Sequence, residues 1–301
     1  MKSIQNLIIR SALVAVVVGL LVAPTASADP VPAQVNTAAK TTILGSGSVA
    51  FSPYLLAAFK KYKKVTKGQV EVIFTVNSGN NGVKDVQTGK SQFAANARAP
   101  LPGAIDAGTT YYKAAKDGMA IIVSKKNKVK NLSIAQLGDI FSGKVTNWNQ
   151  VGGSDAPIEV NGRDAAGGQY NFFRDAVLGG KDLQIGNKHP NDGLVASAVS
   201  NSPNAIGYLG QGFVKTGKKV KYKLVTLNRV PLNETTVRKG KYPLWRFLYL
   251  VTPNTTLAPP VKKLIAWLLT SYDAGQAFRK AGAVPYKQST KPPKKKKKKK
   301  K

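Results

Sequence analysis

The stretch from Phe141 to Phe173 reads FSGKVTNWNQVGGSDAPIEVNGRDAAGGQYNFF, and its pattern decides the fold. The segment PIEV predicts a short strand, and the apolar residues after the glycines predict a helix with Phe172 and Phe173 on its apolar face. Between the two lie Arg163 and a loop of small residues. Such a loop leaves the first N–H groups of a helix free, and a guanidinium adds a planar fork of donors. The stretch therefore predicts a strand–helix unit with an anion site at its turn.

The same order of elements recurs along the chain. Apolar runs of strand length lie at residues 41–44, 70–76, 119–124, 205–209, 220–227 and 244–251. Stretches with helical spacing lie at 52–62, 83–88, 134–141 and 261–269. Ser52 with Pro53 predicts one helix start, and Ser133 with Gln136 predicts a capping box at another. Strands that alternate with helices indicate an α/β fold with largely parallel sheets.

Three loops occupy the same place in this pattern, after a strand and before a helix. They are GSGSVA at 45–50, NSGNNG at 77–82 and GRDAAGG at 162–168. Strand C-termini and helix N-termini converge on one edge of an α/β sheet, where the helix ends carry partial positive charge and unpaired N–H groups. One glycine-rich loop is most simply a turn, but three in one position favour an anion site.

Charge is the most informative part of the composition. The 301 residues are 43% hydrophobic, enough for a sizeable core in two domains or one large one. Lys and Arg number 46 against 14 Asp and Glu, which gives a formal net charge of +32. Part of the excess is the lysine run Lys294–Lys301, where self-repulsion predicts disorder. The rest of the chain is still basic and should attract anions.

The first 28 residues are typical of an export signal. Lys2 and Arg10 supply positive charge, SALVAVVVGLLV is the apolar segment, and Ala26–Ala28 fits a cleavage site before Asp29. The alternative is a membrane anchor, but the apolar run is short for a span. Residues 29–40 contain prolines without periodicity and predict a linker. With no cysteine available for acylation, we expect an exported, soluble protein, periplasmic or extracellular, that is not a lipoprotein.

The sequence gives no support for catalysis. His189 is the only histidine, cysteine is absent, and no nucleotide-binding motif occurs. The carboxylates show no paired-acid spacing, so Asp139, Asp164, Asp175 and Asp192 are expected to be mostly solvated surface groups. We therefore expect no catalytic residue, no metal ligand and no cofactor.

The stretch 141–173 resembles the phosphate-binding proteins of bacterial ABC phosphate importers, which carry IFxGKxxxW, a strand, and then an arginine before a Ser-Gly-Thr loop. GSGSVAFSPYLLAAFKKY, GVKDVQTGKSQFAANARAPL, NAIGYLG and YPLWRFLYLVTP are similar in the same order, so the resemblance covers about residues 41–286. It implies a type II periplasmic binding protein, with two α/β lobes and a ligand cleft between them. It also implies a solute-binding protein that captures phosphate or a related oxyanion for an ABC permease, and we expect a monomer.

The resemblance also implies where the lobes divide. Crossing strands would fall near Met119–Ser124 and Val220–Leu227. Lobe 1 would then comprise 41–120 plus 222–287, lobe 2 would comprise 121–221, and residues 288–301 would form a disordered tail rich in proline and lysine.

The chain departs from the family pattern at the ligand. Arg163 stands at the family's arginine, but Gly167 and Gln169 replace the Ser and Thr that donate to phosphate, and Arg98 replaces the Asp of many members. Backbone amides at 167–169, the Gln169 amide and hydroxyls from the opposite lobe are expected to compensate. Without the Asp, selectivity for phosphate over sulfate should be loose. The expected ligand-binding residues are Ser48, Val49, Ser78, Gly79, Arg98, Arg163, Gly167, Gly168 and Gln169.

Alternatives remain at this point. Arg98 and Arg163 could be ordinary surface arginines. The chain could be a secreted adhesion protein that binds anionic polymers or cell surfaces through its basic body and tail. The lysine tail could equally be an extension without a function of its own. Sequence-specific nucleic-acid binding is not expected, because the aromatic-studded RNA motifs and a helix-turn-helix are missing.

Overall fold

The computed structural model describes residues 40–164, 168–217 and 221–292. The residues from 40 onward belong to one of the two units into which the chain divides. The predicted signal at 1–28, the linker at 29–40 apart from Lys40, the ligand residue Gly167 and the run Lys294–Lys301 all lie outside the described residues.

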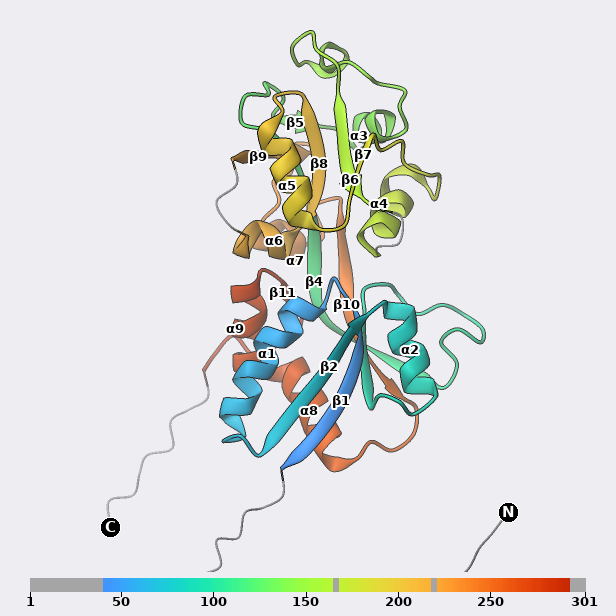
Figure 1. Ribbon diagram of the computed structural model, residues 1–301. Coiled ribbons are helices and arrows are strands. Elements are labelled where there is room, and N and C mark those ends of the chain that lie inside the picture. The colour runs from blue at the N-terminus through green and yellow to red at the C-terminus, as the bar shows by residue number, and fades with distance from the viewer. Residues whose placement is uncertain (1–39, 165–167, 218–220, 293–301) are drawn as a thin grey trace, which may run out of the picture. The chain divides into compact units, whose positions relative to one another are not determined.

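Strands and helices alternate along the chain as the hydrophobic pattern predicted (Figure 1). The strands are β1 (Thr41–Ser48), β2 (Val70–Asn77), β3 (Phe93–Asn96), β4 (Thr109–Ser124), β5 (Asn131–Leu132), β6 (Glu159–Arg163), β7 (Asn187–His189), β8 (Ala205–Gly210), β9 (Tyr222–Leu227), β10 (Trp245–Pro253) and β11 (Val284–Pro285). The helices are α1 (Ser52–Val65), α2 (Gly79–Gln87), α3 (Ile134–Phe141), α4 (Gly168–Leu178), α5 (Asp192–Asn201), α6 (Gln211–Thr216), α7 (Glu234–Arg238), α8 (Pro259–Thr270) and α9 (Tyr272–Ala281), with a 3₁₀ turn η1 (Trp148–Val151).

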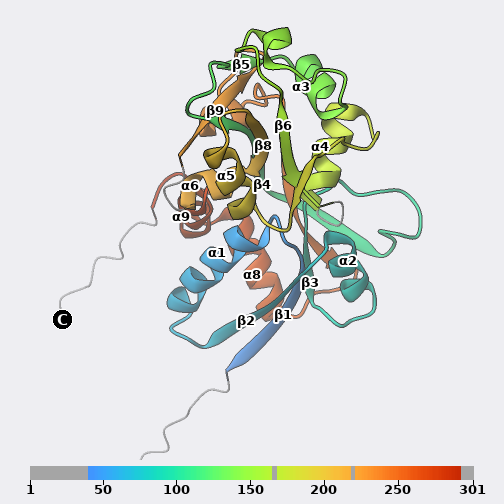
Figure 2. The same ribbon diagram turned by 45° about the horizontal axis from the view of Figure 1, so that its top comes forward.

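Two groups of strands share the long strand β4, and they define the lobes. In lobe 1 the order is β2-β1-β3-β10-β4, with β11 beside β4, and the first part of β4 pairs with β10. In lobe 2 the order is β4-β8-β6-β7, and β9 joins β4 to β5. β4 and β10 run between the lobes in both views (Figure 1 and Figure 2).

The second crossing strand differs from the expectation. It is β10, which pairs with β4 from Trp245 opposite Gly118 to Pro253 opposite Thr109. The expected segment, as far as it is described, is β9, which pairs with β4 at 121–124 and with β5, so it belongs to lobe 2. β10 is almost wholly buried, as a strand covered on both faces must be, whereas β9 alternates between buried and open positions. The strand β9 therefore belongs to lobe 2 rather than lobe 1.

Alternate residues of the central strands face two separate cores in each lobe. In lobe 1, Ala95 and Leu250 pack under α1, α8 and α9, while Ala94 and Val251 pack against α2. In lobe 2 the same alternation along β4 divides a large aromatic core from a smaller one under α5. This period of two places helices on both faces of each sheet.

Trp148 matches the tryptophan of the family pattern IFxGKxxxW and lies in the aromatic core of lobe 2. Its side chain is 1% exposed and its Nε1 donates to the carbonyl of Asn204 at 2.8 Å. The predicted capping box of Ser133 and Gln136 is confirmed at the start of α3. α3 ends at Phe141, whose ring lies 4.6 Å from that of Phe173 in α4. The segment thus fixes α4 against the sheet.

The strand directions bring the ends of both sheets together. β4 leaves lobe 1 and enters lobe 2, and β1 and β2 run in the same direction as β4. β8 and β6 run opposite to β4, so their C-terminal ends point back toward lobe 1. Ser48 and Asn77, which end β1 and β2, therefore lie on the side of lobe 1 that faces the end of β6 at Arg163.

Residue 288 is not the start of a disordered tail. Gln288 is buried, and its Nε2 donates to the carbonyls of Ala114 at 2.9 Å and Leu268 at 2.7 Å. The backbone N–H of Ser289 also donates to the carbonyl of Thr270. The bonds to Leu268 and Thr270 satisfy carbonyls at the end of α8, and the bond to Ala114 reaches β4, so the segment after β11 is tied to lobe 1. Among the residues described, no helix has the length and apolarity needed to cross a membrane.

Candidate anion site

Arg163 is held at the end of β6 by the aromatic core beneath it. Its backbone N–H donates to the hydroxyl of Tyr208 at 3.1 Å, and the Tyr208 ring stacks on Phe173 at 4.4 Å. Burial raises the pKa of Tyr208 well above its ordinary value, so the hydroxyl stays protonated and neutral. The position of the guanidinium thus depends on the packing of α4 against the sheet.

The Arg163 side chain is mostly buried and already has partners. Its Nη1 lies 2.9 Å from Oδ1 of Asp192 and 3.3 Å from Oε1 of Gln169, and its Nη2 donates to the carbonyl of Pro190 at 2.7 Å. Its Nε is buried and has no hydrogen-bond partner among the described residues. Arg163 is therefore not a free surface arginine.

Asp192 is the carboxylate that sequence reasoning misjudged. Its side chain is 12% exposed, so it is not a solvated surface group. Oδ2 accepts from the backbone N–H of Gly210 at 3.1 Å and from Nε2 of Gln169 at 3.3 Å. Asp192 lies 29 residues after Arg163 at the start of α5, and no local pattern in the sequence marks the pairing. Gln169, expected to donate to the ligand, here bridges Arg163 and Asp192 instead.

Arg98 forms a second pair in lobe 1, just beyond β3. Its Nη1 and Nη2 donate to the two oxygens of Asp106 at 2.7 and 2.9 Å, and its Nε donates to Oδ1 of Asn80 at 2.8 Å. Asp106 also accepts from the hydroxyl of Tyr111 and from the backbone N–H of Leu101. Burial opposes ionisation of Asp106, but the bonds from Arg98, Leu101 and Tyr111 prevail and hold its pKa below the ordinary value.

Ser78 and Gly79 begin α2, next to Arg98. The hydroxyl oxygen of Ser78 accepts from the backbone N–H of Asn81 at 3.1 Å, so it caps the helix. A hydroxyl that accepts through its oxygen can still donate its hydrogen to a ligand. At Gly79 a Cβ would lie 2.3 Å from Oδ1 of Asn96, which explains the glycine by packing. The stretch NSGNNG is thus not a loop: Asn77 ends β2, Ser78 caps the helix, and residues 79–82 belong to α2.

GSGSVA is also not a loop over most of its length. Residues 45–48 continue β1 and pair with β2 along their full length. A Cβ at Gly45 would lie 2.4 Å from the Phe93 ring, and one at Gly47 would lie 2.3 Å from the carbonyl of Ala95. The glycines therefore serve close packing within the sheet. Ser48 is buried at the strand end, whereas Val49 is 57% exposed.

The predicted cap at α1 is also different. The helix begins at Ser52 itself, and its N-cap is Phe51, which makes no side-chain cap. The Ser52 hydroxyl donates to the carbonyl of Val49 at 3.0 Å and so closes the turn between β1 and α1.

A buried polar network that the sequence analysis did not identify joins the lobes. Arg246 of β10 donates to the carbonyl of Gly168 at 3.2 Å and lies 3.4 Å from Oδ2 of Asp117. The Tyr54 hydroxyl of α1 donates to Asp117 at 2.9 Å and accepts from the N–H of Gly212 at 3.0 Å. Burial raises the pKa of Asp117, and Arg246 opposes that rise. Charged residues inside the apolar runs KDGMAIIV and LWRFLYLV were the available signal.

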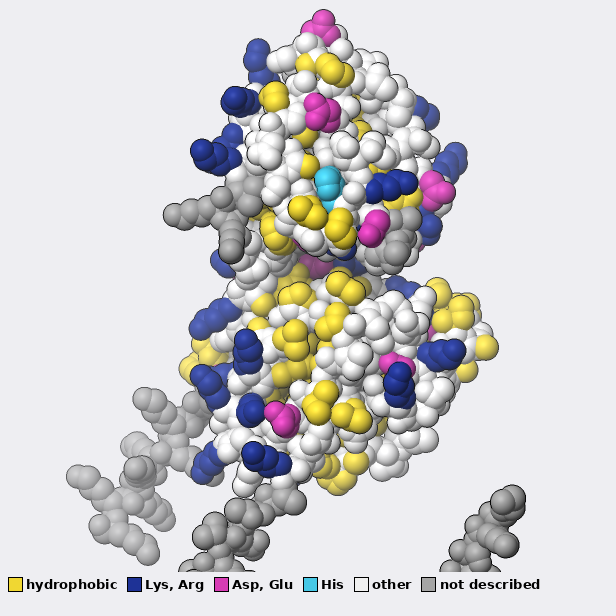
Figure 3. Space-filling view, viewed as in Figure 1, with side chains coloured by type: hydrophobic (Ala, Val, Ile, Leu, Met, Phe, Trp, Pro, Cys, Tyr) yellow, Lys and Arg dark blue, Asp and Glu magenta, His cyan; other side chains and the backbone are white. Residues whose placement is uncertain are grey.

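The predicted residues thus form two groups. In lobe 2, Arg163 of β6 contacts Gln169 of α4, and Gly168 is the first residue of α4. Ser48, Ser78, Gly79 and Arg98 lie at adjoining strand ends and helix starts in lobe 1. Figure 3 shows a hollow between the surface over α5 and the surface over α1, with charged side chains inside it.

Comparison with known proteins assigns the family. A family model described as a PBP superfamily domain matches residues 32–271. The chain belongs to the PBP superfamily. The phosphate-binding protein PstS of Borreliella burgdorferi is 26% identical over 233 residues, which cover 75% of this chain and 83% of that protein. PstS of Bacillus subtilis is 28% identical over 210 residues, which cover 69% and 68%.

The fold of this PBP superfamily chain also matches a solved structure. An ABC-type phosphate transport receptor from Vibrio cholerae aligns with a TM-score of 0.71 over 80% of this chain and 99% of that chain. At 23% sequence identity the likeness concerns the fold alone. The predicted type II periplasmic binding fold is confirmed.

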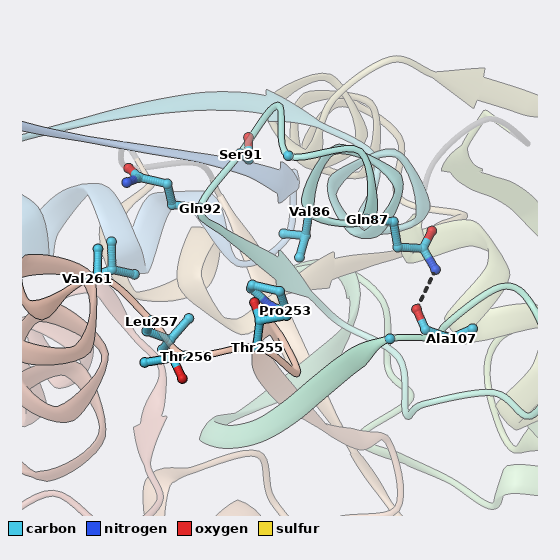
Figure 4. A pocket seen from close by; sticks show the side chains of 13 residues that line it. Val86, Gln87, Ser91, Gln92, Ala107, Pro253, Thr255, Thr256, Leu257 and Val261 are labelled. Atoms are coloured by element: carbon cyan, nitrogen blue, oxygen red, sulfur yellow. Dashed lines mark hydrogen bonds between the residues drawn. The ribbon is translucent and has the colours of Figure 1, made fainter.

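A separate cavity of this PBP superfamily chain lies in lobe 1. It has a volume of about 480 Å³ and lies between the end of α2 and the connection from β10 to α8 (Figure 4). Gln87 closes one side by donating to the carbonyl of Ala107 at 2.9 Å. None of the predicted ligand residues lines it. Within the described ranges, no cluster of three or more His, Asp or Glu is placed to hold a metal ion.

Proposed function

We propose that this protein captures phosphate, or a closely related oxyanion, for import by an ABC-type permease. The observation that carries the proposal is Arg163, a largely buried guanidinium at the end of β6, beside the first turn of α4. A guanidinium and helix N–H groups at one strand end form a donor set for an oxyanion. The phosphate-binding names of both PstS relatives support the same ligand class.

In this proposal, backbone N–H groups at the start of α4 donate to the ligand in place of the hydroxyl groups that the family pattern has there. A Cβ at Gly168 would meet no atom of the other described residues within 4 Å. Glycine lets a ligand come close to the backbone amides there. Ser78 can add a hydroxyl hydrogen from lobe 1, because its oxygen alone is used by the cap. We propose that Ser48, Val49 and Gly79 contribute to the same site through their positions at strand and helix ends. Gly167 lies outside the described residues and is proposed as a contributor from the sequence alone.

The two arginines are assigned different parts in this proposal. Asp106 neutralises Arg98 through two hydrogen bonds, and all three side-chain nitrogens of Arg98 have acceptors. We propose that Arg98 supports the start of α2 rather than clamping the anion. Arg163 is then the main cationic contact.

Calorimetry against a panel of oxyanions tests the function. We expect the mature chain to bind phosphate with heat that saturates at one site per chain, and to bind sulfate more weakly. A variant without Lys294–Lys301 should bind phosphate equally well, because a run of solvent-screened lysine charges steers an anion but does not hold it. Failure of both proteins to bind any oxyanion would refute the proposal. Binding only to polyanions, lost with the tail, would favour an adhesion protein.

Retention at a cell surface is a second part of the proposal. Lysine side chains gather over α1 (Figure 3), and a groove of about 260 Å³ between α1 and α9 is lined by Lys60, Lys61, Lys64 and Lys280, with Asp273 among them. We propose that this groove and the lysine tail attract anionic cell-surface material. Binding to anionic vesicles that persists in 1 M salt, roughly where screening is complete, would contradict this electrostatic account.

The proposed transport role is completed by proposals on catalysis, oligomeric state and export. We propose that the protein is a non-enzymatic monomer without a cofactor. We also propose that it is exported after cleavage before Asp29 and held by no lipid anchor. Intact-mass measurement of secreted protein tests the cleavage: a mass that still includes residues 1–28 would contradict it.

A further inference from the structure

The Gln169 side chain lies between the two charged groups of the lobe 2 site. Its Oε1 accepts from Nη1 of Arg163 at 3.3 Å, and its Nε2 donates to Oδ2 of Asp192 at 3.3 Å. Only one orientation of the carboxamide satisfies both neighbours, because a guanidinium donates and a carboxylate accepts. The amide therefore bridges a cation and an anion that also contact each other.

The backbone of Gly210 forms one wall of this position. A Cβ at Gly210 would lie 2.8 Å from Nε2 of Gln169 and 3.4 Å from Oδ2 of Asp192. The N–H of Gly210 donates to the same Asp192 oxygen that the glutamine amide uses. A side chain at residue 210 would displace the amide, so the end of β8 is shaped around it.

The amide oxygen occupies one of the Arg163 donors that an anion could use. Nη1 of Arg163 carries two hydrogens, and its two acceptors are Asp192 and Gln169. Nη2 gives one of its two hydrogens to the carbonyl of Pro190, and Nε is buried without a partner among the described residues. An oxyanion that approaches Nη1 therefore meets the partial negative charge of the Gln169 oxygen at the same donor.

The glutamine bonds are also the longest in the cluster. Both measure 3.3 Å, beyond the usual 2.7–3.2 Å range for N–H···O bonds, whereas Arg163 to Asp192 measures 2.9 Å. Longer bonds are weaker, so the carboxamide is the partner that Arg163 loses most easily. The Arg163–Asp192 pair can remain in place when the amide leaves.

We propose that Gln169 is a built-in competitor for the anion: its carboxamide holds the Arg163 donor, and an anion oxygen takes that donor only after the amide leaves. The inference rests on the proposed function and refines it. It reverses the role that the sequence suggested for Gln169, which was to donate to the ligand. If Gln169 were a ligand donor, its removal would weaken binding, whereas removal of a competitor strengthens binding.

The test is calorimetric titration of the full mature chain with inorganic phosphate. We expect Gln169→Ala to bind about tenfold more tightly than wild type, which corresponds to about 1.4 kcal/mol. Gln169→Glu should bind more weakly than wild type, because a carboxylate competes better for Arg163 than an amide does. Gln69→Ala removes an exposed glutamine in lobe 1 with no side-chain hydrogen bond among those described, and should leave the affinity unchanged.

Each outcome separates this inference from the proposed function. If wild type and Gln169→Ala bind phosphate equally, or the variant binds more weakly, the function stands and the competitor role is overturned. If neither protein binds any oxyanion, both are overturned. Binding by Gln169→Ala alone would support the competitor role strongly. Should Gln169→Ala fail to fold, Gln169→Asn replaces it, because an amide one methylene shorter cannot span both partners and should bind more tightly in the same way.

Discussion

Arg98 in lobe 1 and Arg163 in lobe 2 are both paired with an aspartate, but the two pairs are built differently. Arg98 meets Asp106 with two parallel hydrogen bonds, and its Nε donates to Asn80. Arg163 contacts Asp192 through one nitrogen only and shares that nitrogen with Gln169. Its Nε is buried without a partner among the described residues.

This difference separates a structural arginine from one that can bind a ligand. A guanidinium whose nitrogens all have fixed acceptors gains little from an anion and loses existing bonds to reach it. A guanidinium with a displaceable neutral partner gains a charged one at small cost. The predictions below start from this contrast.

The largest effect on stability is expected at the lobe 1 pair. Asp106→Ala leaves Arg98, Tyr111 and the Leu101 N–H without their acceptor, and should lower the free energy of unfolding by about 3 kcal/mol, the low end for a broken buried pair. Asp175→Ala is the control, because that side chain is 60% exposed and should change stability by less than about 0.5 kcal/mol. Urea denaturation measures both. A mild effect at Asp106 would mean that Arg98 is not held by it and is available to a ligand.

A smaller effect concerns ligand selectivity. The resemblance led us to expect loose selectivity, because Arg98 stands where many relatives have an Asp. Asp192 already accepts from Arg163, Gln169 and Gly210, so it is poorly placed to accept a proton from hydrogen phosphate. Sulfate should therefore bind within about tenfold of phosphate, or about 1.4 kcal/mol. Competition titrations at neutral pH measure the ratio. Strong rejection of sulfate would contradict this account, because it would show that a carboxylate accepts the proton of hydrogen phosphate, with Asp164 the first candidate to mutate.

The strands and helices could be predicted from the sequence because the patterns that indicate them involve residues close together in the chain. The period of two along the strands, the capping box at α3 and the aromatic residues around Trp148 depend on neighbours within a few positions. The glycines at 45 and 47 were misjudged because a glycine needed for packing, against Phe93 or against the Ala95 backbone, looks the same in sequence as one needed for a loop.

The candidate site was predicted less completely, for a related reason. Arg163 was found from its place after a strand, but its pairing with Asp192 joins residues from different elements. Arg98 was matched by resemblance, while its partner Asp106 lies in an irregular segment without periodicity. The inter-lobe contacts of Arg246 depend on tertiary packing that no spacing rule contains.

The lobe 1 pair should also appear in the pH dependence of stability. Because the folded state holds the pKa of Asp106 below the ordinary value of about 3.9, its contribution is present above that pH and is lost as the pH falls through the folded value. Thermal unfolding of wild type should therefore decline more steeply below about pH 4 than that of Asp106→Asn. Parallel curves would show that Asp106 is not stabilised by Arg98.

The smallest effect is expected from the tail. Deleting Lys294–Lys301 should leave both arginine pairs unchanged and alter stability by less than about 0.5 kcal/mol. Thermal unfolding of the truncated and full chains measures this. A large loss of stability on truncation would show that the tail contributes to the fold.

The most direct test compares phosphate binding by Arg163→Ala and Arg98→Ala, each checked for folding by circular dichroism. The account predicts that Arg163→Ala loses roughly 2–5 kcal/mol of binding free energy, the range for truncating one partner of a buried charged interaction. It predicts that Arg98→Ala, once folded, binds phosphate within about 0.5 kcal/mol of wild type. Phosphate binding as tight in Arg163→Ala as in wild type would contradict the assignment of the anion site to the end of β6.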